Sequence, residues 1–249
     1  MERWSDKVAV VTGASAGIGR GLAEHLVDCG LKVVGLARRK DKLNELADKL
    51  KGRKGTFIPV VADVTKESDV LNAFDWTTKN VGVVHILINN AGLARAKGLL
   101  DGETEAWREI FDTNLLALCV ATREAIKIMR ANGVDGHIVH MNSTGGHYVP
   151  NVPNVNVYCA SKFGVTALTE TLRQELNAVG SKIKVTSVSP GFVEAGVLEN
   201  SELSATVKEV QMCPGLKIKD VCDAVEYVLA TPPHVQVHEI ILRAVGQQI

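Results

Sequence analysis

The sequence has 249 residues, 46% of them hydrophobic and 22% charged, which excludes a largely disordered chain and predicts one globular domain. Its 28 basic and 28 acidic side chains give a formal net charge of zero. This balance argues against nucleic acid or an anionic membrane as a partner and favours a small neutral ligand.

Five cysteines are scattered along the chain without a C-x-x-C pair. This pattern predicts reduced thiols in a reducing compartment, with neither disulfides nor a metal site. The first six residues lack the apolar segment of a signal peptide, and no later run reaches the ~18 apolar residues of a membrane span. We therefore expect a cytoplasmic protein without a membrane span and without a metal.

Short apolar runs rich in Val and Ile alternate with longer helical patterns. Runs that are apolar at nearly every position are typical of parallel strands covered on both faces by helices. Seven strands are expected, over Val8–Val11, Val33–Leu36, Thr56–Val61, His85–Ile88, His137–Met141, Val185–Val188 and Glu239–Leu242. Helices are expected over Ile18–Cys29, Lys40–Lys51, Lys66–Lys79, Thr104–Arg130, Val155–Val179 and Ile218–Ala230.

This alternation predicts an α/β fold of the Rossmann type, a doubly wound three-layer sandwich with a seven-stranded parallel sheet. A single NAD(P)-binding domain would then span residues 1–249. The long stretch Phe192–Leu216 breaks the alternation and is the expected substrate lid.

A glycine-rich segment, Thr12–Gly19, follows the first strand directly and leads into a helix. Glycines at such a turn let the backbone approach a pyrophosphate, whose charge the helix N-terminus then stabilises. The spacing G-x-x-x-G-x-G differs from the more familiar G-x-G-x-x-G, and a tight turn with close helix packing is the alternative. We expect cofactor contacts from Gly13, Ser15, Ala16, Gly17, Ile18 and Gly19.

The second strand ends in Ala37-Arg38-Arg39, where NAD-binding proteins usually place a carboxylate for the ribose hydroxyl. Ala37 offers no such group, whereas Arg38 and Arg39 can form charge-assisted hydrogen bonds to a 2′-phosphate. The alternative is that both arginines only begin a solvated helix. The sequence therefore favours NADP(H) as the cofactor.

Polar side chains also follow the third and fourth strands. Asp63 is placed to hold an adenine amine or, alternatively, to cap the next helix. Asn89 and Asn90 offer donors and acceptors that either brace the sheet or line the cofactor cleft, with bracing at least as good an interpretation for Asn89.

Two further polar residues stand out, one inside a predicted helix and one directly after the fifth strand. Asn114 lies inside the apolar helical segment Trp107–Ala121, where Asn is unfavourable by propensity. This cost suggests a local bend or a held water, and simple tolerance of the Asn is the alternative. Ser143 follows the fifth strand and so lies at the carboxyl edge of the sheet, where its hydroxyl can reach a ligand or simply turn the loop.

Tyr158 and Lys162 are four residues apart in the central part of a predicted helix, so they share one face. A cation beside a phenol stabilises the phenolate and lowers its pKa from ~10 toward the range useful for acid-base catalysis. The Y-x-x-x-K pair alone usually marks only a surface contact. It becomes informative only together with the other motifs.

Taken in order, Thr12–Gly19, Asp63, Asn89–Gly92, Asn114, Ser143, Tyr158 with Lys162 and Pro190-Gly191 resemble the short-chain dehydrogenase/reductase family over nearly the whole chain. Within it, segments such as Gly35–Arg39 and Gly136–His140 are similar to the insect farnesol dehydrogenase-like branch and to member 11-type carbonyl reductases.

This resemblance implies a catalytic tetrad of Asn114, Ser143, Tyr158 and Lys162. Tyr158 would be the general acid-base, Ser143 would orient the substrate oxygen and Asn114 would position a relay water. Lys162 would lower the Tyr158 pKa and hold the nicotinamide ribose. The family often has a Thr where this chain has Ala195. Further cofactor contacts are expected from Val64, Asn90, Ala91, Gly92, Asn114, Tyr158, Lys162, Pro190, Gly191 and Val193.

The expected substrate pocket is largely apolar, with walls that include His147, Tyr148, Val149, Val193, Val197, Leu198 and Met212. Such walls suit a hydrophobic alcohol or carbonyl. The branch resemblance implies farnesol, oxidised to farnesal, with a steroid or general carbonyl reductase as the alternative. A catalytically silent NADP sensor or an epimerase of the extended branch fits less well. The long helices 104–130 and 155–179 predict a homodimer or homotetramer.

Overall fold

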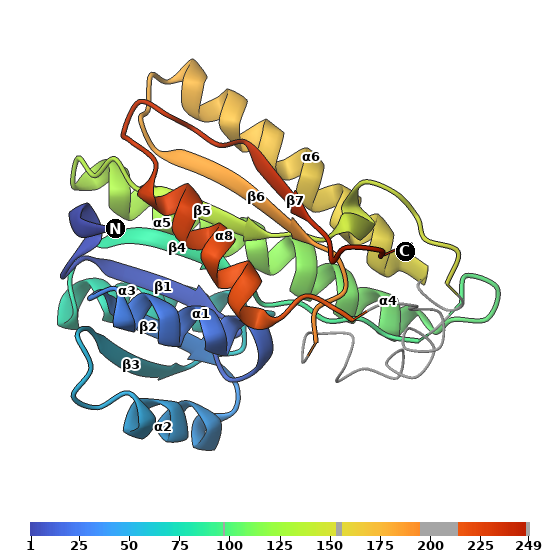
Figure 1. Cartoon of the computed structure of the whole chain (residues 1–249), viewed down its shortest axis with the longest axis horizontal. Helices are drawn as coiled ribbons and strands as arrows, with labels where there is room; N and C mark the ends of the chain where they lie inside the picture. The colour runs from blue at the N-terminus through green and yellow to red at the C-terminus, as the bar shows by residue number, and fades with distance from the viewer. Residues whose placement is uncertain (97, 153–155, 195–213, 248–249) are drawn as a thin grey trace.

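Seven parallel strands form one sheet in the order β3-β2-β1-β4-β5-β6-β7, which confirms the predicted Rossmann-type fold (Figure 1). The computed structural model describes all residues except 97, 153–155, 195–213 and 248–249. The strands are β1 (Val8–Thr12), β2 (Lys32–Ala37), β3 (Thr56–Val61), β4 (Val84–Asn89), β5 (His137–Met141), β6 (Lys184–Pro190) and β7 (Glu239–Leu242).

Helices cover both faces of this sheet. They are α1 (Gly17–Asp28), α2 (Lys40–Lys49), α3 (Glu67–Asn80), α4 (Thr104–Phe111), α5 (Ala117–Ala131), α6 (Asn156–Ala178) and α8 (Ile218–Ala230). Two short 3-10 segments are η1 (Glu2–Trp4) and η3 (Thr144–Gly146), and η2 (Asp112–Leu116) is a π-helical segment.

The apolar strands divide their side chains between two cores. Ala9 and Val11 pack with α1, α2 and α8 on one face, where α1 and α8 lie side by side (Figure 1). Val8 and Val10, which alternate with them, pack with α3, α5 and α6 on the other face. Because both faces are covered, every residue of β1 is buried, and this burial explains the unbroken apolar pattern of its sequence.

The predicted helix Thr104–Arg130 is the main departure from expectation. It consists of α4, the π-helical η2 and α5, so one turn around Asn114 is wider than an α-helical turn. Such π segments insert an extra residue into a helix and often occur at functional sites. The low helix propensity of Asn114 is consistent with this irregularity, although propensity alone did not predict its type.

The expected lid falls mostly on residues 195–213, which lie outside the described residues. The residues that flank this segment are paired, because Val193 and Leu216 form a parallel β-bridge. Glu194 N donates to Leu216 O at 2.8 Å, and Leu216 N donates to Phe192 O at 2.9 Å. Among the helices in the described part of the chain, none is long and apolar enough to cross a membrane.

Candidate active site

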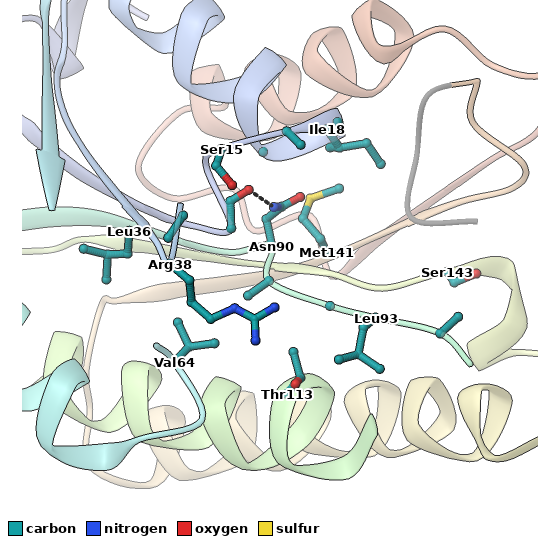
Figure 2. Close-up of a pocket in the computed structure, with 18 of the residues that line it drawn as sticks. Ser15, Ile18, Leu36, Arg38, Val64, Asn90, Leu93, Thr113, Met141 and Ser143 are labelled. Carbon is teal, nitrogen blue, oxygen red and sulfur yellow. Dashed lines mark hydrogen bonds between the residues drawn. The ribbon is translucent and has the colours of Figure 1, made fainter. Parts of the chain in front are cut away.

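A cleft of about 510 Å³ lies at the carboxyl ends of the strands, across the point where β1 and β4 pair (Figure 2). The chain order reverses here, which is where ligands bind in open α/β sheets. Every residue expected to contact the cofactor lines this cleft except Asn114. Sequence reasoning missed other lining residues, namely Leu36, Ala37, Ala62, Thr65, Leu93, Ala94, Arg95, Thr113, Met141 and Asn142.

The glycine loop packs closely against the end of β4. Gly13 and Gly17 have φ angles of 71° and 54°, a region of backbone conformation that residues other than glycine rarely adopt. At Gly19, a Cβ atom would collide with the Asn90 side-chain amide and the Gly13 carbonyl. The close packing of the loop is therefore confirmed, and the same glycines leave the N-terminus of α1 at the cleft wall. Binding of a pyrophosphate there stays a prediction.

Asn90 and Thr12 fasten the two strands that flank the cleft. The Asn90 side-chain amide donates to Thr12 O at 2.9 Å. It also donates to Gly13 O at 3.4 Å (Figure 2). Thr12 Oγ1 accepts from the backbone N–H groups of Asn90 and Ala91 at 3.0 and 2.9 Å. Asn89 instead donates to Thr122 Oγ1 at 2.9 Å in the interior, so Asn89 braces the sheet.

The two arginines after β2 have different surroundings. Arg39 donates through two guanidinium nitrogens to Ser15 Oγ, at 3.0 and 3.3 Å, and so ties the end of β2 to the glycine loop. The Arg38 side chain extends over the cleft (Figure 2). Burial opposes ionisation of Asp63, but hydrogen bonds from Thr65 and the Arg38 charge hold the Asp63 pKa below its ordinary value.

Ser143, Tyr158 and Lys162 meet at the other end of the cleft. Ser143 follows β5 and its Oγ accepts from Gly145 N at 3.0 Å, which fixes the start of η3. Tyr158 and Lys162 lie on α6, with Lys162 Nζ 5.8 Å from the centre of the Tyr158 ring. Tyr158 lies near the described start of α6, at Asn156, and not in the central part of the helix as expected.

Burial controls the protonation of this pair. It raises the pKa of Tyr158 to about 12, against a smaller lowering effect of the hydrogen bond with Ser143. Burial also lowers the pKa of Lys162 to about 8. The expected lowering of the Tyr158 pKa is therefore wrong in net direction for this structure, because loss of hydration disfavours the phenolate more than its neighbours stabilise it.

Lys162 is a buried cation, and its Nζ donates to Met141 O at 2.8 Å. Replacing Lys162 with Met should raise the free energy of unfolding at neutral pH by about 1 to 2 kcal/mol, although that hydrogen bond is lost. The folded pKa, about 8, lies below the unfolded value of ~10.4. Below the folded-state pKa, the buried Lys162 charge destabilises the fold to its full extent. This destabilisation disappears as the pH rises toward the pKa of Lys162 in the unfolded chain.

Urea unfolding of both proteins across this pH window measures the difference. The advantage of Lys162→Met should narrow as the pH rises, because the unmodified protein gains stability there. An advantage that stays constant with pH, or a variant that is less stable at neutral pH, would contradict this account.

Asn114 lies beneath the cleft and is only 2% exposed. Its Oδ1 accepts from Leu93 N at 2.9 Å, while Nδ2 donates to Leu93 O at 3.0 Å and to Ser161 Oγ at 2.9 Å. The side chain therefore joins η2, the loop after β4 and α6. With its polar atoms used in this way, the Asn114 side chain holds the Leu93 backbone in place at the cleft wall, and the neighbouring Thr113 lines the cleft.

A cluster of hydrogen-bonded polar side chains, which the sequence did not predict, anchors the loop after Ser143. His147 Nε2 lies 2.8 Å from Glu239 Oε1 and 3.2 Å from Ser189 Oγ. Ser187 and Ser189 donate to the same Glu239 oxygen at 3.0 and 2.8 Å. His147, an expected pocket wall, therefore contacts the ends of β6 and β7. Of the other expected walls, Val193 lines the cleft, but Tyr148 and Val149 do not. Val197, Leu198 and Met212 lie outside the described residues.

A Rossmann-type cleft with a glycine loop at one end and a Ser, Tyr and Lys at the other is that of a dinucleotide-dependent oxidoreductase. Residues 7–205 match the family described as short chain dehydrogenase, and the chain belongs to that family.

Relatives and solved structures agree with this assignment. The chain is 48% identical to dehydrogenase/reductase SDR family member 11 of Bos taurus, covering 99% of each. It is 44% identical to farnesol dehydrogenase of Aedes aegypti, covering 100% of each. The closed form of a serine dehydrogenase complexed with NADP+ matches with a TM-score of 0.87 and 29% identity, over 97% of this chain and 96% of the other.

Proposed function

We propose that this protein is an NADP(H)-dependent oxidoreductase that interconverts a hydrophobic alcohol and its carbonyl. The observation that carries the proposal is the convergence of Ser143, Tyr158 and Lys162 at one end of a cleft that Arg38 lines at the other. A dinucleotide phosphate needs a cation where Arg38 lies and a proton donor where Tyr158 lies.

The described residues fit such a cofactor. The glycine loop and the N-terminus of α1 line the cleft, where their backbone N–H groups would bind the pyrophosphate. Arg38 would bind a 2′-phosphate, and Asp63 would accept from the adenine amine. Lys162, buried beside the Met141 carbonyl, would donate to the nicotinamide ribose. When bound, the nicotinamide ring supplies or accepts the hydride.

Tyr158 would handle the proton. With its pKa near 12, the phenol carries its proton at neutral pH, so it can donate that proton to a carbonyl oxygen during reduction. For oxidation the phenolate must accept the hydroxyl proton, and the reaction should speed up as pH rises. Ser143, hydrogen-bonded with Tyr158, would hold the substrate oxygen between the two hydroxyls.

The substrate end is apolar. Ala94, Val152, Cys159 and Phe192 form one buried cluster with the Tyr158 ring. This environment favours a hydrophobic substrate over a charged one. Farnesol, oxidised to farnesal, is the first candidate because the Aedes aegypti relative is a farnesol dehydrogenase. The second candidate, a steroid or general carbonyl reductase, is supported by the resemblance to member 11-type carbonyl reductases.

An activity screen tests the proposal. The purified chain would be given NADP+ with farnesol, a hydroxysteroid or a short aliphatic alcohol, and NADPH with the matching carbonyls, at about neutral and at alkaline pH. We expect the highest kcat/KM with the apolar substrates and faster oxidation at alkaline pH. Cofactor binding without turnover of any of these compounds would favour the alternative of an NADP sensor.

The assembly and compartment are further parts of the proposal. Leu116, the last residue of η2, and Phe163 on α6 are apolar and exposed, which supports a homodimer or homotetramer formed through these helices. Light scattering would give the mass. None of Cys29, Cys119, Cys159 and Cys222 is in a disulfide, which suits a reducing compartment such as the cytoplasm.

A further inference from the structure

Three side chains with metal-binding chemistry meet on the face of the sheet covered by α1 and α8. The ligand atoms of His25, Cys29 and Glu226 all lie within 4.8 Å of one another. We propose that this cluster, here called the α1–α8 cluster, is a binding site for Zn²⁺. It is separate from the cofactor cleft, which none of its three residues lines.

The helices hold the three groups in place. His25 and Cys29 are four residues apart at the end of α1 and so share one face, and Glu226 faces them from α8. The two helices approach closely, because a Cβ atom on Gly21 would collide with the Ile218 side chain. The site is therefore built between two packed helices, and its ligands need only side-chain rotations to close on an ion.

The donor set suits zinc. Imidazole nitrogen, thiolate and carboxylate are the ligands that Zn²⁺ takes in tetrahedral sites, with bonds of about 2.0 to 2.3 Å. At present His25 Nε2 lies 2.6 Å from Glu226 Oε2, a hydrogen bond that the ion would replace. The side chains of His25 and Glu226 are 24% and 39% exposed, so an ion can enter from solvent and a water can complete the tetrahedron.

Charge balance also favours a divalent ion. Zinc binds the thiolate form of cysteine, so binding would release one proton from the Cys29 thiol to solvent. The thiolate and the Glu226 carboxylate beside it would together neutralise Zn²⁺.

The absence of a metal motif from the sequence has a simple reason. His25 and Glu226 are 201 residues apart, so their spacing could not reveal the site, and only the packing of α8 on α1 brings them together. The site would clamp the first helix to the last. It lies eight residues, or roughly 12 Å along α1, from the helix N-terminus at the cleft, so the clamp should affect stability more than catalysis.

Cobalt provides a spectroscopic probe of the full-length chain. With reduced, metal-free protein and Co²⁺ alone, we expect one equivalent to produce visible bands of tetrahedral cobalt and a sulfur-to-cobalt charge-transfer band in the near ultraviolet. Added Zn²⁺ should remove both. Without Co²⁺, one equivalent of Zn²⁺ should raise the thermal unfolding temperature, since an ion that binds only the folded state stabilises it.

Variants assign these signals to the cluster. Cys29→Ser should remove the charge-transfer band, and His25→Gln or Glu226→Gln should lead to loss of tight Co²⁺ binding, because each removes one of the three protein ligands. The matched controls Cys222→Ser and Cys119→Ser should keep the full signal. The variants' thermal stability without metal shows that they fold. Unchanged cobalt spectra in Cys29→Ser and His25→Gln, or no tetrahedral signal in the unmodified chain, would overturn the proposal.

Discussion

Tyr158→Phe should lower kcat by about 10³-fold while leaving the affinity for NADPH within a factor of two to three, because general acid-base groups contribute roughly 10² to 10⁴ in rate. The variant loses only the hydroxyl that hydrogen-bonds with Ser143. The ring keeps its place among the apolar side chains beside it. Substrate and cofactor would still bind, but no group would remain to donate or accept the proton.

Steady-state kinetics with the best substrate of the screen, together with NADPH titration by fluorescence, measure the two effects separately. Tyr227→Phe is the matched control, since Tyr227 is 61% exposed on α8 and should lose nothing. If Tyr158→Phe keeps more than about a tenth of the activity, Tyr158 is not the general acid. If NADPH binding is also lost, the substitution has damaged the fold and not the chemistry.

Arg38→Ala should lower kcat/KM for NADPH by about 10- to 100-fold and leave kcat/KM for NADH almost unchanged. A charge-assisted hydrogen bond to phosphate contributes roughly 1.5 to 3 kcal/mol to binding. NADH has no 2′-phosphate and cannot form this bond, so its binding should not change. Arg38 lines the cleft, with no carboxylate on Ala37 beside it to bind a ribose hydroxyl. The unmodified protein should therefore prefer NADPH.

Comparison of both coenzymes at subsaturating concentration gives this ratio directly. Arg53→Ala is the control, because Arg53 pairs with Asp28 on the surface and should leave both coenzymes unaffected. Arg39→Ala should have a broader effect, since Arg39 holds Ser15 in the glycine loop. A preference of the unmodified protein for NADH, or an equal loss of both coenzymes in Arg38→Ala, would refute the assignment of NADP(H).

The sequence predicted best those structural features that require one particular type of residue. The unbroken apolar runs predicted the strands because both faces of the sheet are buried, and the range of α8 was predicted to the residue. The glycine loop was predicted because residues other than glycine rarely adopt the φ of Gly13, and because a side chain at Gly19 would collide with its neighbours. These are local requirements that neighbouring residues reveal.

Properties that depend on distant parts of the chain could not be predicted in this way. The pKa of Tyr158 follows from how completely the fold buries it, which spacing to Lys162 does not report. In the π-helical segment, the Asn114 side chain bonds with Leu93 and Ser161, which are distant in sequence. The pairing of His147 with Glu239 joins residues that are far apart in sequence, and neither residue alone differs from an ordinary polar residue of a loop or strand.

The hydrogen bonds between Thr12 and Asn90 have a consequence for how the protein folds. They join β1 to β4, residues 78 positions apart, and the units β1–β3 and β4–β7 meet along this line. Contacts so distant in sequence form late, because a long loop must close before they are gained. Neither unit alone contains both walls of the cleft. The capacity to bind the dinucleotide should therefore appear only at the end of refolding, and bound ligand should slow the separation of the two units.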